Sequence, residues 1–180
     1  LYNIMKNELK KYLTQLSIIK GDFILSSGEK SNYYIDARLC TLSSKPLSII
    51  TSIFYQKITQ FNINYVGGPT IGADPIVGAL LQKASDEKYN LSGFLARSTD
   101  KKHGTKKLIE GPDIESKDVI LVEDVVSTGG SLIKVIEELK NLKCNVNAIL
   151  SIVDREMNAE KKFKDLNINY YPIFKVSELL

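Results

Sequence analysis

The stretch Val119-Ile-Leu-Val-Glu-Asp-Val-Val-Ser-Thr-Gly-Gly-Ser131 carries the features that decide the fold. An apolar run, Val119 to Val122, ends in the acidic pair Glu123 and Asp124, and a loop of small residues follows from Ser127 to Ser131. Apolar residues then recur at helical spacing, at positions 132, 135, 136 and 139. The stretch therefore predicts a buried strand, an acidic pair, a glycine-rich turn and a helix.

The turn suits a phosphate and the acids suit hydroxyl groups. Glycines let the backbone approach a ligand, and free N–H groups at a helix N-terminus bind anions. Glu123 and Asp124 would repel a phosphate, so they fit neutral hydroxyls or a metal bound with the substrate. The loop lacks the Gly-Lys-Ser/Thr ending of a P-loop and the G-x-G-x-x-G spacing. The pattern indicates a sugar phosphate, although an ordinary strand–turn–helix with a polar cap is the plain alternative.

The whole chain fits a single domain over residues 1–180. Its proportions, 43% hydrophobic and 25% charged, are usual for a soluble protein of a size that buries a real core. A net charge of +3 gives no argument for nucleic acid, and no apolar run approaches the roughly 20 residues that cross a bilayer. We therefore expect neither as a partner. Cys40 and Cys144 stand in no metal or redox spacing and the start shows no signal-peptide pattern, so we expect a cytoplasmic protein.

Short apolar runs alternate with helical patterns along most of the chain. We expect strands near 63–66, 91–96, 119–122, 146–153 and 168–174, and helices near 46–61, 74–85, 130–142 and 158–166. Before them stand one helical pattern around 9–16 and two short extended pieces, near 23–25 and 33–36. Strand–helix alternation predicts an α/β fold, a central parallel sheet with helices on both faces. Ligands of such sheets bind at the carboxyl ends of the strands.

Two further loops follow expected strands. The backbone N–H groups of Gly67 to Gly72 can hold a diphosphate, although a plain turn fits equally well. The segment Arg97 to Lys107 contains five Lys or Arg, the only histidine and one acid. Such a charge run is more often merely solvated. Beside a phosphate site, however, a long cationic loop can serve as a lid that stabilises a leaving diphosphate.

Two shorter segments suit a planar, acidic substrate. Arg155 directly follows an expected strand and can hold a carboxylate with two hydrogen bonds, although a surface ion pair with Asp154 or Glu156 is the simpler interpretation. Tyr33 and Tyr34 follow a Ser-Ser-Gly turn, and they can either cover a planar base by stacking or form a core hairpin.

The stretch from Val119 to Ser131 resembles the motif of type I phosphoribosyltransferases that binds phosphoribosyl pyrophosphate (PRPP). Five segments, in order and over nearly the full length, resemble the orotate branch of that family: Gly21–Gly28 with Ser31–Asp36, Gly67–Pro69 with Gly72–Pro75, Lys102–Thr105 with Ile109–Pro112, Glu123–Ser131, and Val153–Glu156. The resemblance implies the parallel-sheet fold described above, with a small N-terminal hood of about residues 1–40 that covers the base.

The resemblance also implies an enzyme of pyrimidine synthesis. It would transfer the phosphoribosyl group of PRPP to orotate and give orotidine 5′-monophosphate and diphosphate. Mg²⁺ would arrive with PRPP and lie near Glu123 and Asp124, without direct protein ligands. The enzyme would be a homodimer whose loop Arg97 to Lys107 reaches the neighbouring active site.

By position, the resemblance assigns roles to individual residues. The catalytic residues would be Lys101, His103 and Asp124. The PRPP-binding residues would be Arg97, Lys101, His103, Glu123, Asp124, Val125, Val126, Ser127, Thr128, Gly129, Gly130 and Ser131. The orotate-binding residues would be Ser26, Tyr34, Ser127 and Arg155.

The chain departs from the family's usual pattern at two places. Ser98 replaces a second basic residue after Arg97, which concerns the strength of diphosphate binding. Met157-Asn158-Ala159 replaces an acid and glycines after Glu156. Two alternatives stay open: a purine-salvage phosphoribosyltransferase, against which Arg155 argues, and a catalytically weak PRPP-binding regulator, toward which Ser98 leans.

Overall fold

A six-stranded sheet of order β5-β4-β3-β6-β7-β8 forms the centre of the computed structural model, which describes residues 1–24, 28, 30–97 and 108–180. Five strands are parallel, and only the short β5 pairs antiparallel, with β4. The strands are β3 (Tyr65–Pro69), β4 (Ser92–Ala96), β5 (Ile109–Glu110), β6 (Asp118–Val126), β7 (Asn145–Asp154) and β8 (Asn169–Lys175). From β3 the chain runs outward to β4 and β5 and then returns to β6 on the other side of β3. Strand order therefore reverses between β3 and β6, where such sheets form their ligand crevice.

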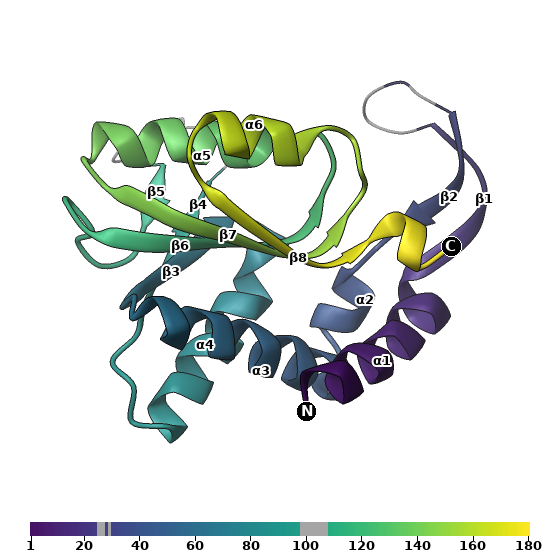
Figure 1. Ribbon diagram of the computed structural model, residues 1–180, viewed down its shortest axis with the longest axis horizontal. Coiled ribbons are helices and arrows are strands. Elements are labelled where there is room, and N and C mark those ends of the chain that lie inside the picture. The colour runs from purple at the N-terminus through teal and green to yellow at the C-terminus, as the bar shows by residue number, and fades with distance from the viewer. Residues whose placement is uncertain (25–27, 29, 98–107) are drawn as a thin grey trace.

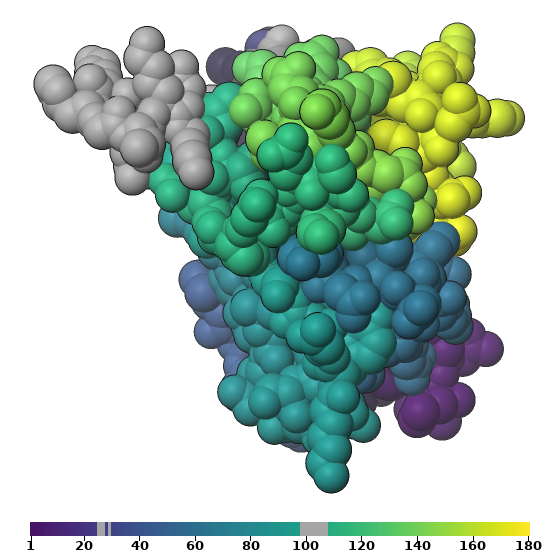
Figure 2. All heavy atoms as spheres, turned by 90° about the vertical axis from the view of Figure 1, so that its left-hand side faces the viewer, coloured from purple at the N-terminus to yellow at the C-terminus, as the bar shows by residue number. Residues whose placement is uncertain are grey.

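Helices cover both faces of this sheet, as the sequence predicts (Figure 1). α3 (Ser44–Phe61) and α4 (Ala73–Asp86) lie on one face, and α5 (Gly130–Asn141) and α6 (Ala159–Asp165) lie on the other. Figure 2 shows the same two layers from the side, with the green surface of the α5 region above the blue and teal surface of α3 and α4.

Alternation along β6 divides the core between the two faces. Ile120 and Val122 belong to the cluster beneath α3 and α4, whereas Val119 and Leu121 belong to the cluster beneath α5 and α6. All four side chains are fully buried, because successive residues of a strand point to opposite faces and this strand lies in the middle of a covered sheet.

The N-terminal segment forms a small unit beside the sheet. It comprises α1 (Tyr2–Tyr12), a π-helical turn η1 (Leu13–Ser17), the antiparallel hairpin β1 (Ile18–Ile24) and β2 (Lys30–Ile35), and α2 (Arg38–Thr41). The hairpin stands at the same end of the molecule as the carboxyl end of β8 and the final turn η2 (Val176–Glu178) (Figure 1). An ion pair of 2.9 Å between Lys6 and Glu178 joins α1 to that turn. The hood role of this unit stays a prediction.

The strands extend beyond their apolar runs. β6 continues through Glu123 and Asp124 to Val126, four residues past the predicted end, because its backbone keeps pairing with β7, up to Val126 opposite Asp154. Likewise β3 ends at Pro69, not at Val66. Backbone pairing does not depend on apolar side chains, so polar residues that serve a ligand can lie within a strand.

Among the described residues, no helix combines the length and the apolar character needed to cross a membrane.

Candidate active site

The predicted site residues lie at the carboxyl ends of neighbouring parallel strands. The loop after β3 contains Thr70 and Gly72, the end of β6 contains Glu123 and Asp124, and Arg155 follows β7. β6 lies between β3 and β7, so these three segments meet at one edge of the sheet. These segments thus lie at the carboxyl ends of the strands, as the sequence predicts, and the structure adds that the strand order reverses there.

The acidic pair is folded back on its own backbone. A Glu123 Oε1 oxygen accepts a hydrogen bond from the Asp124 N–H (3.1 Å), and an Asp124 Oδ1 oxygen accepts one from the Val125 N–H (2.6 Å). Glu123 is only 6% exposed, and Asp124 is half-buried. Burial, helped by the neighbouring Asp124 carboxylate, raises the pKa of Glu123 well above its ordinary value. A partly exposed carboxylate at the strand end can accept hydrogen bonds from hydroxyl groups.

The loop after β3 packs directly against these acids. A Cβ atom added to Gly72 would collide with Asp124 Oδ1 and would lie 2.8 Å from Glu123 Oε1. A Cβ atom at Gly68 would collide with the Val122 carbonyl oxygen. The glycines of the predicted diphosphate loop therefore bring its backbone against β6, and only residues without side chains permit this approach.

The loop after β6 leads into α5 with the geometry expected of a phosphate cradle. Gly129 has a left-handed backbone (φ 78°), and its carbonyl accepts the first helical hydrogen bond, from the Ile133 N–H (2.9 Å). Thr128, Gly130 and Ser131 are exposed, and Ser127 is half-buried. Free N–H groups at the start of this twelve-residue helix can receive an anion from the solvent side.

A cavity of about 390 Å³ connects the diphosphate loop with the first turn of α5. Thr70, Arg97 and Ser131 line it, together with Lys134, a cation that no sequence motif marks. Arg97 forms an ion pair of 3.5 Å with Glu110, and its backbone N–H donates to the Leu108 carbonyl (2.8 Å). Its predicted contact with diphosphate stays a prediction. Lys101 and His103 lie outside the described residues.

Arg155 faces the N-terminal hairpin. Its guanidinium carbon lies 5.4 Å from the centre of the Tyr33 ring, and its buried Nε atom has no hydrogen-bond partner among the described residues. The two acids that were the simpler ion-pair partners are engaged elsewhere: Asp154 accepts from the Glu156 N–H (2.8 Å), and Glu156 accepts from the Ser177 N–H (2.9 Å). The Nε atom is thus an unsatisfied donor, and a carboxylate is the kind of group that satisfies it.

The two tyrosines of the hairpin lie on opposite faces of β2. Tyr33 is half-buried against Arg155, whereas Tyr34 is exposed and packs on Phe23, with ring centres 5.8 Å apart. The contact of Tyr34 with orotate stays a prediction, and Tyr33 joins it as a candidate, because strand alternation makes only one of two neighbours face the sheet. Ser26 lies outside the described residues.

Sequence reasoning missed the pair Asp36 and Arg38, just after β2. The carboxylate accepts from Arg38 Nε (2.8 Å) and from the second guanidinium nitrogen (3.0 Å). These hydrogen bonds lower the pKa of Asp36 and raise the pKa of Arg38. Asp124 makes a smaller contribution to the raised pKa of Arg38. An Asp-x-Arg triplet has no local pattern that sets it apart from a surface pair.

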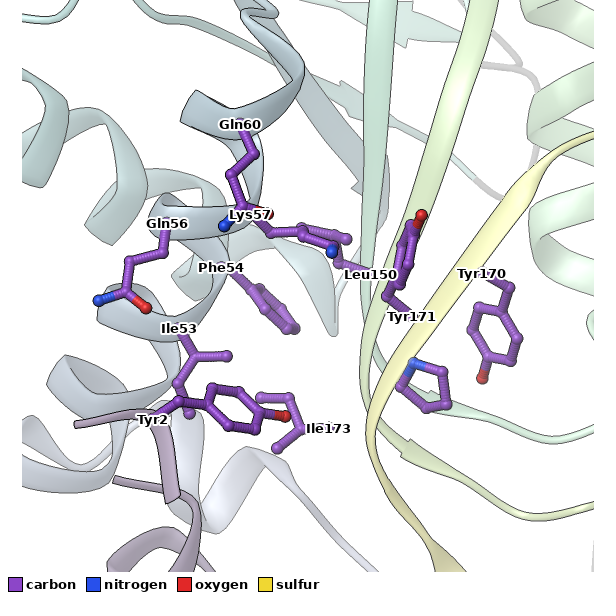
Figure 3. A pocket seen from close by; sticks show the side chains of 11 residues that line it. Tyr2, Ile53, Phe54, Gln56, Lys57, Gln60, Leu150, Tyr170, Tyr171 and Ile173 are labelled. Carbon is purple, nitrogen blue, oxygen red and sulfur yellow. The ribbon is translucent and has the colours of Figure 1, made fainter. Parts of the chain in front are cut away.

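A separate hollow of roughly 400 Å³ lies between α3, α1 and the first half of β8 (Figure 3). Tyr2, Phe54 and Tyr171 contribute aromatic walls, and the Lys57 ammonium lies 4.1 Å from the centre of the Tyr171 ring. Its described lining residues include none of those predicted for the site. The hollow is therefore separate from the described residues that are predicted for the site.

Two carboxylates at the end of β6 fit the surroundings of a metal ion that arrives on a substrate. Within the described ranges, no group of three or more His, Cys, Asp or Glu side chains is arranged to hold a metal by itself. Mg²⁺ prefers to keep waters and substrate phosphates among its ligands, with one or two protein carboxylates. Glu123 and Asp124 can therefore lie near an ion whose direct ligands are waters and substrate phosphates.

Comparison with known proteins agrees with this geometry. A family model described as phosphoribosyl transferase domain matches residues 43–176, which include β3, the acidic strand β6 and Arg155. The chain belongs to the phosphoribosyltransferase family.

The relatives narrow the family further. The chain is 36% identical to the orotate phosphoribosyltransferase of Tropheryma whipplei, over 99% of this chain and 84% of that protein. It is 38% identical to the protein of the same name from Pyrococcus horikoshii, over 97% and 93% of the two chains. The crystal structure of Mycobacterium tuberculosis orotate phosphoribosyltransferase in complex with PRPP is similar with a TM-score of 0.80 at 25% identity, covering 97% and 98%. Within its family, the chain belongs to the orotate phosphoribosyltransferases.

Proposed function

We propose that this protein transfers the phosphoribosyl group of PRPP to orotate, forming orotidine 5′-monophosphate and diphosphate, in the synthesis of pyrimidine nucleotides. One observation carries the proposal: the acidic pair of β6, the glycine turn that begins α5, and Arg155, whose buried Nε atom has no hydrogen-bond partner among the described residues, meet at the strand-order reversal. The first two suit a phosphorylated sugar, and the third suits a base that bears a carboxylate. Purine bases have no carboxylate for Arg155 to bind.

The sugar half of the site suits displacement at the anomeric carbon of ribose. As the bond to diphosphate breaks, positive charge develops on the sugar and negative charge on the leaving group. Asp124 accepts hydrogen bonds from the ribose hydroxyls and stabilises the first charge, and Glu123 forms hydrogen bonds with the same hydroxyls. The residues from Val125 to Ser131 hold the 5′-phosphate, so the anomeric carbon is fixed relative to the acids.

The leaving diphosphate is held from the opposite side. The backbone of the Gly67 to Gly72 loop, together with Arg97, faces the place where its oxygens gain charge. Lys101 and His103 complete this cationic surround in the proposal. Magnesium bound with PRPP would neutralise part of the diphosphate charge, and Glu123 and Asp124 would be the carboxylates near it.

Orotate is recognised by its ring and its carboxylate. Arg155 donates hydrogen bonds to the carboxylate, with Nε as one available donor. Tyr33 or Tyr34 covers the ring, and Ser26 and Ser127 supply hydroxyl contacts. Hydrogen bonds from a half-buried arginine set orotate apart from bases that lack the carboxylate.

The experiment that tests the proposal follows orotate absorbance in the presence of PRPP and Mg²⁺, in parallel with adenine and hypoxanthine. We expect orotate to be consumed and neither adenine nor hypoxanthine to be consumed. Turnover of a purine without turnover of orotate would replace the proposal by purine salvage. Binding of PRPP without turnover of any base would identify a regulator.

A homodimer with shared active sites is part of the proposal. In a two-fold dimer, the cationic loop of one chain can complete the site that contains Asp124 of the other. Mixing Lys101→Ala with Asp124→Ala then creates mixed dimers in which one site carries both changes and the other neither. Random pairing makes about half the dimers mixed, so activity should recover to roughly a quarter of wild type.

A control with each variant exchanged against itself sets the baseline of that mixing experiment. No recovery, once subunit exchange has been verified with labelled chains, would mean that each loop serves its own subunit.

The proposed compartment is the cytoplasm, because Cys40 and Cys144 are both buried free thiols, as is common in reducing compartments.

A further inference from the structure

The loop that cradles phosphate is held from behind by α6. The Lys162 ammonium donates a hydrogen bond of 2.8 Å to the Thr128 carbonyl oxygen, across 34 residues of sequence. One residue on, a Cβ atom at Gly129 would lie 2.9 Å from the Phe163 ring and 3.3 Å from the Ala159 Cβ. Phe163 and Ala159 are buried, so α6 presents a fixed surface to this turn.

The hydrogen bond from Lys162 sets the direction of one peptide group. A trans peptide bond is planar, and its C=O and N–H point in opposite directions. Holding the Thr128 carbonyl toward α6 therefore turns the Gly129 N–H away from α6, toward the exposed side of the loop. Successive N–H groups aimed to one side make an anion-binding nest, and the left-handed conformation of Gly129 is typical of one.

Lys162 also brings a positive charge to this loop. None of the ion pairs among the described residues involves its ammonium, whereas Lys175 pairs with Glu160 at 3.4 Å. A cation one peptide group behind the cradle attracts a bound phosphate through the intervening dipole. No sequence pattern marks this role, because Lys162 stands in an ordinary amphipathic helix.

We propose that Lys162 is a positioning residue for the 5′-phosphate: it orients the Thr128–Gly129 peptide and adds positive charge to the phosphate loop. The proposal rests on the proposed function, which assigns this loop to the sugar phosphate. It extends that function by making one end of PRPP, and not the other, depend on α6. Diphosphate, bound at the loop after β3, should be indifferent to Lys162.

The test measures the dissociation constants of ribose 5-phosphate and of diphosphate by calorimetry, at one fixed ionic strength. Lys162→Gln should weaken ribose 5-phosphate roughly tenfold, as expected for loss of one charged hydrogen bond. It should leave diphosphate unchanged within about twofold, a difference of under 0.5 kcal/mol. Lys162→Arg, which keeps the charge and a donor, should recover most of the affinity.

Lys164→Gln is the matched control, because it removes the same charge from the same helix at an exposed position. It should bind both ligands as wild type does. Equal affinity of wild type and Lys162→Gln for ribose 5-phosphate would overturn the proposal, as would equal weakening of both ligands. If wild type itself bound no ribose 5-phosphate, the proposed function would fail, and this inference with it.

Discussion

Two glycines show how differently the two halves of the site are built. At Gly72, beside the sheet edge, an added methyl group would run into Asp124 and Glu123. At Gly28, between β1 and β2, an added Cβ atom would meet no atom of the described residues within 4 Å. At the sheet edge, backbone packs closely against the buried Glu123 and the half-buried Asp124, whereas the hairpin is exposed along most of β1.

This difference separates the roles of the two regions. The part assigned to PRPP is fixed by backbone contacts between β3, β6 and the loops that follow them. The part assigned to orotate depends on a few side chains that bridge the hairpin and the sheet, above all Arg155 and Tyr33. We therefore expect changes at the edge to act on turnover and PRPP, and changes at the bridge to act on orotate.

Asp124→Asn should have the largest effect. It keeps the shape of the side chain and removes the charge that faces the sugar, so kcat/KM for PRPP should fall roughly 10²- to 10³-fold. Steady-state kinetics with each substrate varied in turn measure this. Asp118→Asn, at the other end of the same strand, is the control and should be nearly silent. Unchanged kinetics of Asp124→Asn would remove that residue from the site.

Arg155→Ala should act on the other half. Loss of charged hydrogen bonds of this kind costs about 1.5–3 kcal/mol, so the KM for orotate should rise roughly 10- to 150-fold while that for PRPP changes little. Arg155→Lys keeps the charge but not the paired donors, and it should recover only part of the loss. Normal orotate kinetics in the alanine variant would place the carboxylate elsewhere.

Gly72→Ala tests the close packing at the edge. Overpacking typically costs about 1–3 kcal/mol, and if displaced acids bear that cost, kcat/KM for PRPP should fall roughly 5- to 150-fold. Gly78→Ala, in the middle of α4 with no atom near its added Cβ, is the matched control. In an Asp124→Asn background the same Gly72→Ala change should cost less, because the two residues act through one contact. Full additivity would show that Gly72 acts on something other than Asp124.

Glu123→Gln should give the smallest change in free energy of the four variants, and that change should raise the free energy of unfolding. Burial raises the pKa of Glu123 above its ordinary value of 4.5, so the folded state keeps a proton that the unfolded state releases. Stability of the wild type is therefore lost as pH rises from about 4.5 through the folded pKa, and the glutamine variant lacks this loss. At neutral pH the variant should melt roughly 2–4 °C higher, the shift for about 1 kcal/mol in a chain of this size. Melting curves at pH 4.5 and pH 7.5 measure it; a gap that does not widen at the higher pH would contradict burial of the carboxyl group as the cause.

The sequence predicted most of the sheet and the acidic strand end with its glycine turn because both have local patterns. Apolar runs and helical spacings mark β3, β4, β6, β7 and β8 but not the two-residue β5, and the acid–hydroxyl–glycine order marks the turn before α5. The sequence-based prediction ended β6 at Val122 because the run of apolar residues ends there, whereas backbone pairing with β7 continues to Val126. Strand ends that serve a ligand are polar, so a hydrophobic pattern cuts them short.

Contacts between distant segments could not be predicted in this way. Nothing in the sequence connects Lys162 with Thr128, because that contact depends on how α6 packs on the sheet. Nor does the sequence show that Tyr33, and not Tyr34, contacts Arg155, because that contact depends on how the hairpin packs on the sheet. Asn158 illustrates a milder case. It adopts a left-handed conformation (φ 66°), which asparagine tolerates better than most residues.

The division between the two halves is tested most directly by comparing two ligands, orotidine 5′-monophosphate, which fills both halves, and ribose 5-phosphate, which fills only the sugar half. Their dissociation constants should be measured by calorimetry for wild type, Asp124→Asn and Arg155→Ala. We predict that Asp124→Asn weakens both ligands by a similar factor, and that Arg155→Ala weakens only orotidine 5′-monophosphate. An Arg155→Ala protein that loses both ligands equally, or that keeps its affinity for orotidine 5′-monophosphate, would contradict the division.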